Sequence, residues 1–491
     1  MSSVTNVGAA AEEAPFSMKA IMGPMMAIVV GMIMVILDST VMNIALPTLM
    51  SDFDSTVNTM QWSITAYTLA LSAVIPLAGW LTDRFGAKQI FLITIFLFTA
   101  GSLLCSFATT PEQLIIYRII QGVGGGMVQP IGMAIIFKLA PPNKQGAVMG
   151  MLGIPMMLGP ALGPVLGGYL LEYATWHWIF LINLPIGIIA IMVGLRFLPK
   201  VERKTVPALD FWGMLLAPIA FATLSYAVSE GGKDWGSTST LVSLGIGIAA
   251  LLLFILVELR HKQPLLELRV FGSSDFTIGM FASWLMTMAL FGSFLFVPMY
   301  MQQVFHYEPL KTGFMILPQV AMTGLFMPIG GKLFDKFGAR VVSMVGIGFV
   351  AAGLFYMSQI AADSGAGYVI TATMMMGVGM GLSMMPVNTH ILKVAPRKLV
   401  GRVTPLVSAA QQVIVSFAIA GLASYMANRV ESHMTVTKGD AAAALVSAFG
   451  DTFLVAGCIA VAGALLAILL RRPKDAEAEG GDAVNAPVMM H

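Results

Sequence analysis

Asp38 and Arg118 are charged residues that lie inside stretches of otherwise apolar sequence. The apolar run before Asp38, residues 21–37, has 17 residues, and a helix needs about 20 to cross a bilayer. The helix therefore has to continue toward Pro47, which places Asp38 in its outer half. An ionised Asp at that depth costs about 2.5–3.5 kcal/mol on insertion scales, so we expect it to face an aqueous cavity or a cationic partner. Arg118 is the basic residue placed to be that partner.

This pair of charges has two interpretations. In the first, the Asp38 carboxylate binds and releases a proton, and a cationic ligand competes with the proton for the same carboxylate. In the second, Asp38 and Arg118 form a static ion pair that locks two helices together. Both interpretations use the same residue types, and the sequence leaves both open.

The second half of the chain offers no equivalent carboxylate. Asp275 and Asp451 fall at the ends of predicted helices. His390 is the rival titratable group, but it lies three residues before Lys393, and we expect it to be an interfacial histidine. We therefore predict a single proton-binding carboxylate in the chain.

The composition is that of a membrane protein. Of the 491 residues, 57% are hydrophobic and 11% are charged, and the mean hydropathy is +0.84, whereas an average soluble domain has about 25% charged residues. The net charge of +2 does not indicate a nucleic-acid partner. No paired carboxylates within a span, no metal-ligand cluster and no nucleotide-binding motif are found, so we expect neither an enzyme nor an ATP-driven pump.

Apolar windows bounded by charge, Pro or Gly predict fourteen transmembrane helices, which makes the fold an all-α polytopic membrane protein. The predicted spans lie near 19–47, 58–81, 88–107, 112–137, 145–171, 177–198, 210–229, 238–258, 275–300, 310–332, 340–361, 366–393, 402–427 and 448–470. With the N-terminus inside, 22 of the 27 basic residues fall in segments on that side and four fall on the other. Because inner loops carry the excess of Lys and Arg, we expect both termini in the cytoplasm and the chain in the inner (plasma) membrane.

The chain also contains an internal repeat. Residues Pro76–Lys88 and Pro328–Arg340 share seven of thirteen positions. The Gly-rich stretch 121–127 corresponds in the same way to 376–382. The sequence thus predicts two pseudo-symmetric six-helix bundles, an arrangement that secondary transporters use for alternating access.

The seventh and eighth predicted helices have no counterpart in the repeat, so we interpret them as an inserted pair. The predicted domains are a cytoplasmic tail 1–18, an N-terminal bundle 19–198, a linker with the inserted pair 199–274, a C-terminal bundle 275–471 and a cytoplasmic tail 472–491.

Five motifs carry a family resemblance. They are Gly79-x-Leu81-x-Asp83-Arg84-x-Gly86-x-Lys88, the stretch Leu37–Pro47 with Asp38 and Asn43, Arg118-x-x-Gln121-Gly122, and Gly159-Pro160-x-x-Gly163-Pro164, followed by Phe180–Gly187. The first resembles the loop signature of the major facilitator superfamily, and the others resemble its fourteen-helix drug/proton antiporter branch. Ala87 departs from the pattern, because the family usually has a second basic residue there.

The resemblance implies a multidrug efflux transporter that exports lipophilic, often cationic, compounds by proton-coupled antiport. The implied coupling residues are Asp38 and Arg118, with the proton as coupling ion and no other cofactor. One proton-binding carboxylate would give about one proton per cycle, so exchange with a monovalent cation would be electroneutral. An exporter of an endogenous lipid, fatty acid or siderophore would have the same scaffold and is the alternative.

A second group of residues is predicted to switch the conformation: Gly79, Asp83, Arg84, Gly86, Lys88, Asp335, Gly159, Pro160, Gly163 and Pro164. Glycines permit tight turns and close helix approach, and a carboxylate can interact with the positive N-terminal end of a helix. We expect Asp83 to reach the opposite half near Gly401 and Arg402. The alternative is that Asp83 and Arg84 only cap helix ends and orient the chain.

A third group is predicted to bind the substrate, because polar and aromatic groups interrupt apolar helices there: Asp38, Asn43, Gln61, Trp62, Thr65, Tyr67, Trp284, Met288, Phe291, Gln319 and Gln411. The chain has 38 methionines and 29 phenylalanines, and such side chains can form an adaptable wall. Most of them are equally explained as lipid-facing residues. An envelope adaptor protein is a conceivable partner, and we expect a functional monomer.

Overall fold

The computed structural model describes residues 18–55, 57–199, 211–231, 234–261, 264, 266–361, 364–396, 399–436 and 440–471. These residues form helices joined by short turns, with no strand among them. The predicted tails 1–17 and 472–491 and most of the linker before the seventh predicted span lie outside this part of the chain.

The helices follow the predicted order. Their bounds are α1 Met18–Asp52, α2 Val57–Val74, α3 Leu77–Phe85, α4 Ala87–Ser106, α5 Pro111–Leu139, α6 Gln145–Tyr173, α7 His177–Leu181, α8 Asn183–Phe197, α9 Phe211–Gly231, α10 Thr238–Arg260, α11 Ser274–Gln303, α12 Pro309–Phe337, α13 Ala339–Ser358, α14 Ala366–Val394, α15 Val400–Val436 and α16 Ala441–Ala467, with short 3-10 helices at Pro142–Lys144 and Leu268–Gly272.

Eleven of the described helices are long and apolar enough to cross a membrane, and a bent pair of helices can supply a twelfth span. The two other predicted spans, 145–171 and 210–229, coincide with helices α6 and α9. The protein is thus a multi-pass, all-helical membrane protein, and the count of fourteen spans stays a prediction.

The second predicted span is not one straight helix. The prediction placed it at 58–81, but α2 ends at Val74 and the chain bends by 55° before continuing in α3. Pro76 lies at the bend, where its ring and its missing N–H interrupt the helical hydrogen bonds.

The repeated stretch is helical up to a single glycine, whereas the predicted spans left residues 82–87 and 333–339 outside the helices. In the first copy, α3 runs to Phe85 and α4 begins at Ala87, so the turn is reduced to Gly86 with φ 95°. In the second copy, Gly338 with φ 81° separates α12 from α13 in the same way. Residues that carry a side chain rarely adopt such φ values, which explains the glycine at both positions.

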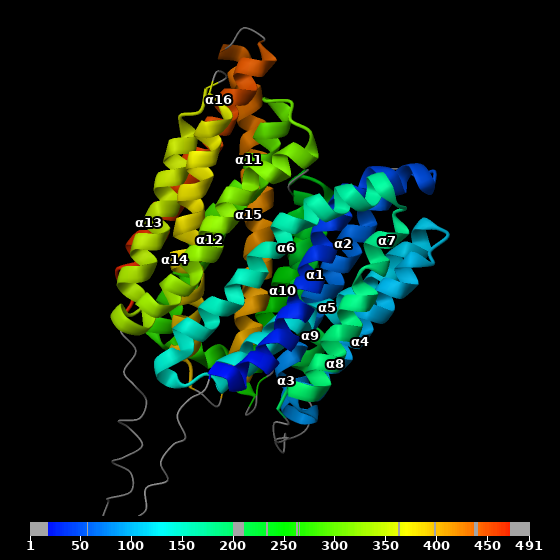
Figure 1. The fold of residues 1–491 in the computed structure, drawn as a ribbon, viewed down its shortest axis with the longest axis vertical. Coiled ribbons are helices and arrows are strands. Elements are labelled where there is room, and N and C mark those ends of the chain that lie inside the picture. The colour runs from blue at the N-terminus through cyan, green and yellow to red at the C-terminus, as the bar shows by residue number, and fades with distance from the viewer. Residues whose placement is uncertain are drawn as a thin grey trace, which may run out of the picture.

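The chain folds into two helical groups (Figure 1). Helices α1–α8 form the N-terminal half and α11–α16 form the C-terminal half. Helix α6 packs along α12, and α15 contacts α3 and α5, so these helices join the halves. Helix α9 packs on α10, on α2 and on α15, which places it beside both halves.

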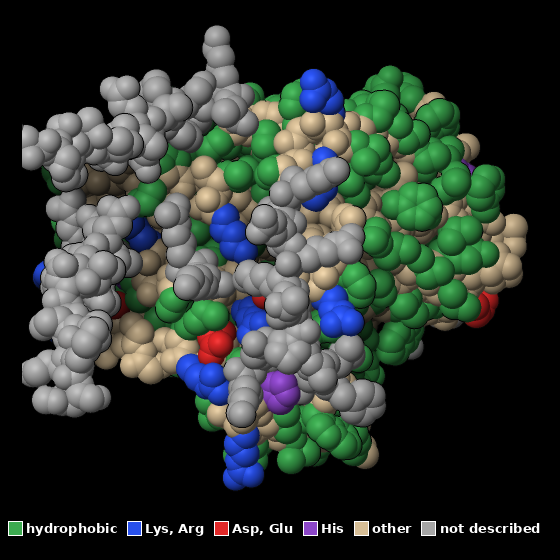
Figure 2. Space-filling model, turned by 90° about the horizontal axis from the view of Figure 1, so that it is seen from below, with side chains coloured by type: hydrophobic (Ala, Val, Ile, Leu, Met, Phe, Trp, Pro, Cys, Tyr) green, Lys and Arg blue, Asp and Glu red, His purple; other side chains and the backbone are tan. Residues whose placement is uncertain are grey.

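Basic side chains gather at one end of the molecule. We use the name terminal face for this end of the molecule, where α1 begins and where the repeated turns lie. It is the lower end in Figure 1, and Figure 2, the view from below, shows Lys and Arg side chains gathered across it while hydrophobic side chains cover the sides. This distribution suits a protein whose flanks contact lipid and whose basic end faces water.

Candidate functional site

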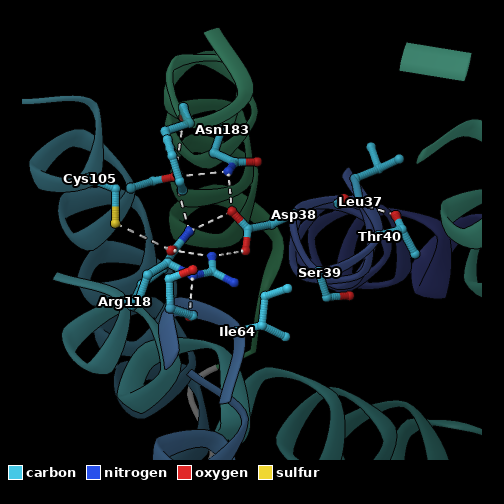
Figure 3. A network of polar contacts seen from close by, with 12 residues as sticks. Leu37, Asp38, Ser39, Thr40, Ile64, Cys105, Arg118 and Asn183 are labelled. Atoms are coloured by element: carbon cyan, nitrogen blue, oxygen red, sulfur yellow. Dashed lines mark hydrogen bonds and ion pairs between the residues drawn. The ribbon is translucent and has the colours of Figure 1, made fainter. Parts of the chain in front are cut away.

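Asp38 on α1 is the centre of a buried polar network in the N-terminal half (Figure 3). Its Oδ2 lies 2.5 Å from Nη1 of Arg118 on α5. Its Oδ1 accepts hydrogen bonds from Nε2 of Gln121 at 2.7 Å and from Nδ2 of Asn183 at 3.0 Å. Both carboxylate oxygens are therefore engaged, and α1, α5 and α8 are held together at one point.

A second ring of contacts supports these partners. The Ser102 hydroxyl of α4 accepts from Gln121 at 3.1 Å and from Asn183 at 2.8 Å, and it donates to the Phe180 carbonyl at 3.1 Å. The side-chain NH2 groups of Gln121 and Asn183 thus each donate to Asp38 and to Ser102, which fixes the orientation of both amides. Asn183 lies in the quoted stretch 180–187 and Gln121 in the motif that begins at Arg118, so the sequence carried a signal for both that the site prediction missed.

The Arg118 guanidinium has further partners beside Asp38. It donates from Nη1 to Gln121 Oε1 at 2.7 Å and from Nε to the Ser63 carbonyl at 3.3 Å. The Tyr67 ring lies 4.1 Å from the guanidinium carbon, a cation–π distance. Tyr67 was predicted to bind substrate, but it is buried and belongs to this network.

The network is sealed from solvent. The exposed fraction of the Asp38 side chain is 0% and that of Arg118 is 1%. The predicted pairing of the two residues is confirmed, but the expectation that Asp38 faces an aqueous cavity is wrong for this conformation. Packing of α1 against α5 and α8 closes the site, and such packing is not readable from a single helix.

At the terminal face, the first repeat of the N-terminal half contacts the C-terminal half. Asp83 Oδ2 lies 3.4 Å from Nε of Arg402 at the start of α15. A Cβ on Gly79 would lie 2.7 Å from the Gly401 carbonyl oxygen. The predicted proximity of Asp83 to Gly401 and Arg402 is confirmed, and Gly79 permits it because any side chain there would collide with α15.

The second repeat makes the corresponding contact in the opposite direction. Asp335 accepts hydrogen bonds from the backbone N–H groups of Gly146 and Ala147, both at 3.0 Å. These groups belong to the first turn of α6, where unpaired N–H groups and the helix dipole favour a negative charge. A Cβ on Gly146 would lie 2.6 Å from the Gly331 carbonyl oxygen, so here too glycine allows close approach.

The remaining switch residues act within the N-terminal half. Lys88 donates from Nζ to the carbonyls of Leu195 at 2.7 Å and Leu198 at 2.8 Å, which ties α4 to the end of α8. Arg84 is exposed. The contacts of Lys88 lie within the N-terminal half, and the part of both residues in switching stays a prediction.

The glycines of α6 allow it to pack on α1. A Cβ on Gly159 would collide with Ile36, and one on Gly163 with Thr40. α6 is nevertheless assigned as one helix over its full length. The side chains of Pro160 and Pro164 lie outside the described part of the structure, and the predicted hinge stays a prediction.

A small space between the halves is the second place where predicted residues meet. We call it the central pocket, and its lining residues are Gln129, Met133, Met156, Met384, Met385, Asn388, Leu392, Thr404, Val407, Ser408 and Gln411. They come from α5 and α6 on one side and from α14 and α15 on the other. In this conformation the space for a water-sized molecule is about 20 Å³, enough for about one water molecule.

The other predicted substrate residues are not brought together. Trp62 stacks on Tyr226 of α9 with ring centroids 5.9 Å apart. Gln319 is buried and donates to Met380 Sδ at 3.7 Å within the C-terminal half. Among the predicted residues, only Gln411 lines the central pocket.

Helix α11 supplies three further predicted substrate residues. Trp284, Met288 and Phe291 are each half-buried, and none lines the central pocket. Thr65 is half-buried on α2. The side chains of Asn43 and Gln61 lie outside the described part of the structure.

Other titratable groups of the C-terminal half lie away from the central pocket. His390 is buried on α14 with 0% exposure, and its expected depth at the membrane interface stays a prediction. Asp451 pairs with Arg429 at 2.5 Å and His433 at 2.8 Å where α16 meets the far end of α15. Within the described ranges, no three His, Cys, Asp or Glu residues are placed to hold a metal ion.

Comparisons with known proteins show the same class of molecule. A profile of the Major Facilitator Superfamily matches residues 28–419. The "Multidrug resistance protein B homolog" of Mycobacterium tuberculosis is 36% identical over 418 residues, which is 84% of this chain and 77% of that protein. The "Lincomycin resistance protein LmrB" of Listeria monocytogenes is 30% identical over 440 residues, 89% of this chain and 93% of that protein.

The fold also resembles solved structures. The proton:xylose symporter XylE, bound to 6-bromo-6-deoxy-D-glucose, superposes with a TM-score of 0.63 at 15% sequence identity, covering 92% of this chain and 95% of that one. At this identity the likeness concerns the fold alone.

Proposed function

The chain belongs to the major facilitator superfamily, and we propose that it exports lipophilic compounds from the cell by proton-coupled antiport through alternating access. We place it in the fourteen-helix drug/proton antiporter branch, in the plasma (inner) membrane, with the terminal face in the cytoplasm. Relatives named for multidrug and lincomycin resistance support export of toxic compounds as the physiological role.

The observation that carries proton coupling is the buried Asp38–Arg118 pair. With Asp38 ionised, each carboxylate oxygen accepts a charged or amide donor, and the pair is neutral as a whole. Protonation would leave the Arg118 guanidinium as an uncompensated buried charge, which is strongly unfavourable. The network that joins α1, α5 and α8 engages both oxygens of the Asp38 carboxylate in this conformation.

It follows that a proton binds in a different conformation from the one described. A group that is ionised in one state and protonated in another makes the balance between the states depend on the proton gradient. Because the carboxylate is sealed and its oxygens are occupied, a cationic substrate has no access to it here. We therefore assign Asp38 to the proton, and competition with a cationic substrate for the same carboxylate stays a prediction for a conformation in which Asp38 is accessible.

The contacts at the terminal face support alternating access. Asp83 with Arg402, and Asp335 with the start of α6, hold the halves together on this side. With this side in the cytoplasm, the conformation is closed to the cytoplasm. Opening it requires both contacts to break.

The experiment compares growth of a drug-sensitive host in lipophilic compounds with the wild type, Asp38→Asn and Glu112→Gln. Glu112 is an exposed carboxylate in the first turn of α5 and serves as the matched control. We expect protection by the wild type and Glu112→Gln, and its loss in Asp38→Asn at equal membrane expression. Equal protection by Asp38→Asn would refute the coupling role. If the wild type protects against no toxic compound, an endogenous amphiphile becomes the leading cargo.

A further inference from the structure

The central pocket contains hydrogen-bonding groups that carry no charge. Gln411 Nε2 donates to Asn388 Oδ1 at 3.3 Å and to Ser283 Oγ at 3.2 Å. The Asn388 Nδ2 donates to the Met384 carbonyl at 3.1 Å. Gln129, Thr404 and Ser408 add another amide and two hydroxyls to the lining. The pocket thus offers donors and acceptors from both halves.

Methionine side chains supply most of the apolar lining. Met133 and Met156 come from the N-terminal half, and Met384 and Met385 come from the C-terminal half. Unbranched, polarizable thioethers adapt to ligands of different shape. They bind apolar surface and provide no formal charge.

None of the residues that line the pocket is ionisable. The buried carboxylate of Asp38 is fully enclosed by its own partners. Asp83 and Asp335 are engaged at the terminal face. A cation in the pocket would therefore lose its hydration without gaining a counter-ion, which is costly within a membrane.

We propose that the cargo of the central pocket is an uncharged amphiphile whose carbonyl, amide or hydroxyl groups pair with Gln411 and Asn388. This inference rests on the proposed exporter function and names its substrate class. An uncharged cargo changes the energetics of exchange, because each proton that enters is no longer balanced by a departing cation. Transport then moves net charge, in contrast to the electroneutral exchange expected from the sequence.

The size of this effect can be stated. One charge moved through 100 mV corresponds to about a fifty-fold change in the concentration ratio that transport can sustain. The membrane potential alone should therefore drive the cargo at zero pH difference. Electroneutral exchange of a proton for a monovalent cation would not respond to it.

The test uses purified protein in proteoliposomes and two probes, a coumarin that carries a dimethylamide group and the same coumarin with a trimethylammonium group. A potassium gradient with valinomycin sets the potential at equal pH on both sides. We expect potential-driven transport of the amide probe and at least ten-fold slower transport of the ammonium probe. Preference for the ammonium probe would overturn the cargo class and leave the exporter function intact. Amide transport that ignores the potential would overturn the exchange of a proton for this cargo. Transport of neither probe, by protein that also fails to protect a host, would overturn both.

A substitution tests the pocket itself. Gln411→Glu places a carboxylate in the lining, and we expect it to reduce transport of the amide probe at least ten-fold and to raise transport of the ammonium probe. Gln412→Glu adds the same charge at the next position of α15, outside the pocket lining, and should leave the preference unchanged. Asn388→Asp is a second pocket variant in case Gln411→Glu does not purify as a monodisperse protein. Equal probe preference in the pocket variants and in Gln412→Glu contradicts the assignment.

Discussion

Removing the Asp38 carboxylate alone leaves the Arg118 guanidinium buried with only neutral partners. In Asp38→Asn these are the Gln121 amide oxygen at 2.7 Å, the Ser63 carbonyl at 3.3 Å and the Tyr67 ring. Because both side chains of the pair are sealed, solvent cannot compensate the lost charge. Breaking a buried pair by removing one partner costs about 3–5 kcal/mol, so we expect a clear fall in thermal stability.

Removing both charges together should cost far less. In the double variant Asp38→Leu with Arg118→Met no charge is stranded, and replacing a buried pair with apolar residues is often neutral or stabilising by about 1–4 kcal/mol. Gln121 and Asn183 would each lose one acceptor but keep the Ser102 hydroxyl, so each loss should cost less than a fully unsatisfied group, which costs about 1–3 kcal/mol. These terms nearly cancel, and we expect the double variant to be close to the wild type in stability.

The assay combines thermal unfolding of the detergent-purified variants with transport in proteoliposomes under an imposed pH difference. If Asp38 couples transport to protons, the double variant folds but moves cargo only down its own gradient, with no response to the pH difference. A double variant that folds and keeps proton-driven transport would refute the coupling role and favour the static ion pair. An Asp38→Asn protein as stable as the wild type would refute the energetic argument.

Two further predictions concern the terminal face. Gly79→Ala brings a Cβ within 2.7 Å of the Gly401 carbonyl oxygen, so it should reduce cross-linking between cysteines introduced into α3 and α15. The control is Gly348→Ala, whose added Cβ would have no atom within 4 Å and should leave the cross-linking unchanged. Equal cross-linking in both variants would contradict the close contact. Asp335→Asn weakens two charge-assisted hydrogen bonds to the start of α6, each worth about 1.5–3 kcal/mol, and should increase labelling, from the terminal face, of cysteines introduced into the central pocket. Unchanged labelling would show that this contact does not hold the halves closed.

The sequence predicted those parts of the site that depend on charge inside an apolar helix. A lone carboxylate in a membrane span needs a partner, and Arg118 was the basic residue at a suitable depth, so the pair could be found without coordinates. The enclosure of Asp38 could not, because it depends on how four helices pack around one side chain. Gln121 and Asn183 are neutral, so burying them in a span does not carry the large cost that marks a buried charge. Both nevertheless lie in motifs that are visible in the sequence.

The fold also has features that the sequence predicted and features that it did not. Hydrophobic length and the distribution of basic residues predicted the order of the helices, because both follow directly from transfer into lipid. The sequence did not reveal that the repeated stretch is helical up to a single glycine, since Gly86 and Gly338 look like ordinary turn residues within a longer polar loop. Substrate residues were predicted least well, because which face of a helix meets the other half is set by packing.

Helix α9 contacts α2 of one half and α15 of the other. Under the proposed alternating access it can stay attached to only one half, and the stack of Trp62 on Tyr226 favours attachment to α2. On the opposite side, α6 and α12 contact each other directly without an intervening helix. The two seams between the halves are therefore built differently, and we expect a compound that enters sideways from the bilayer to use one of them.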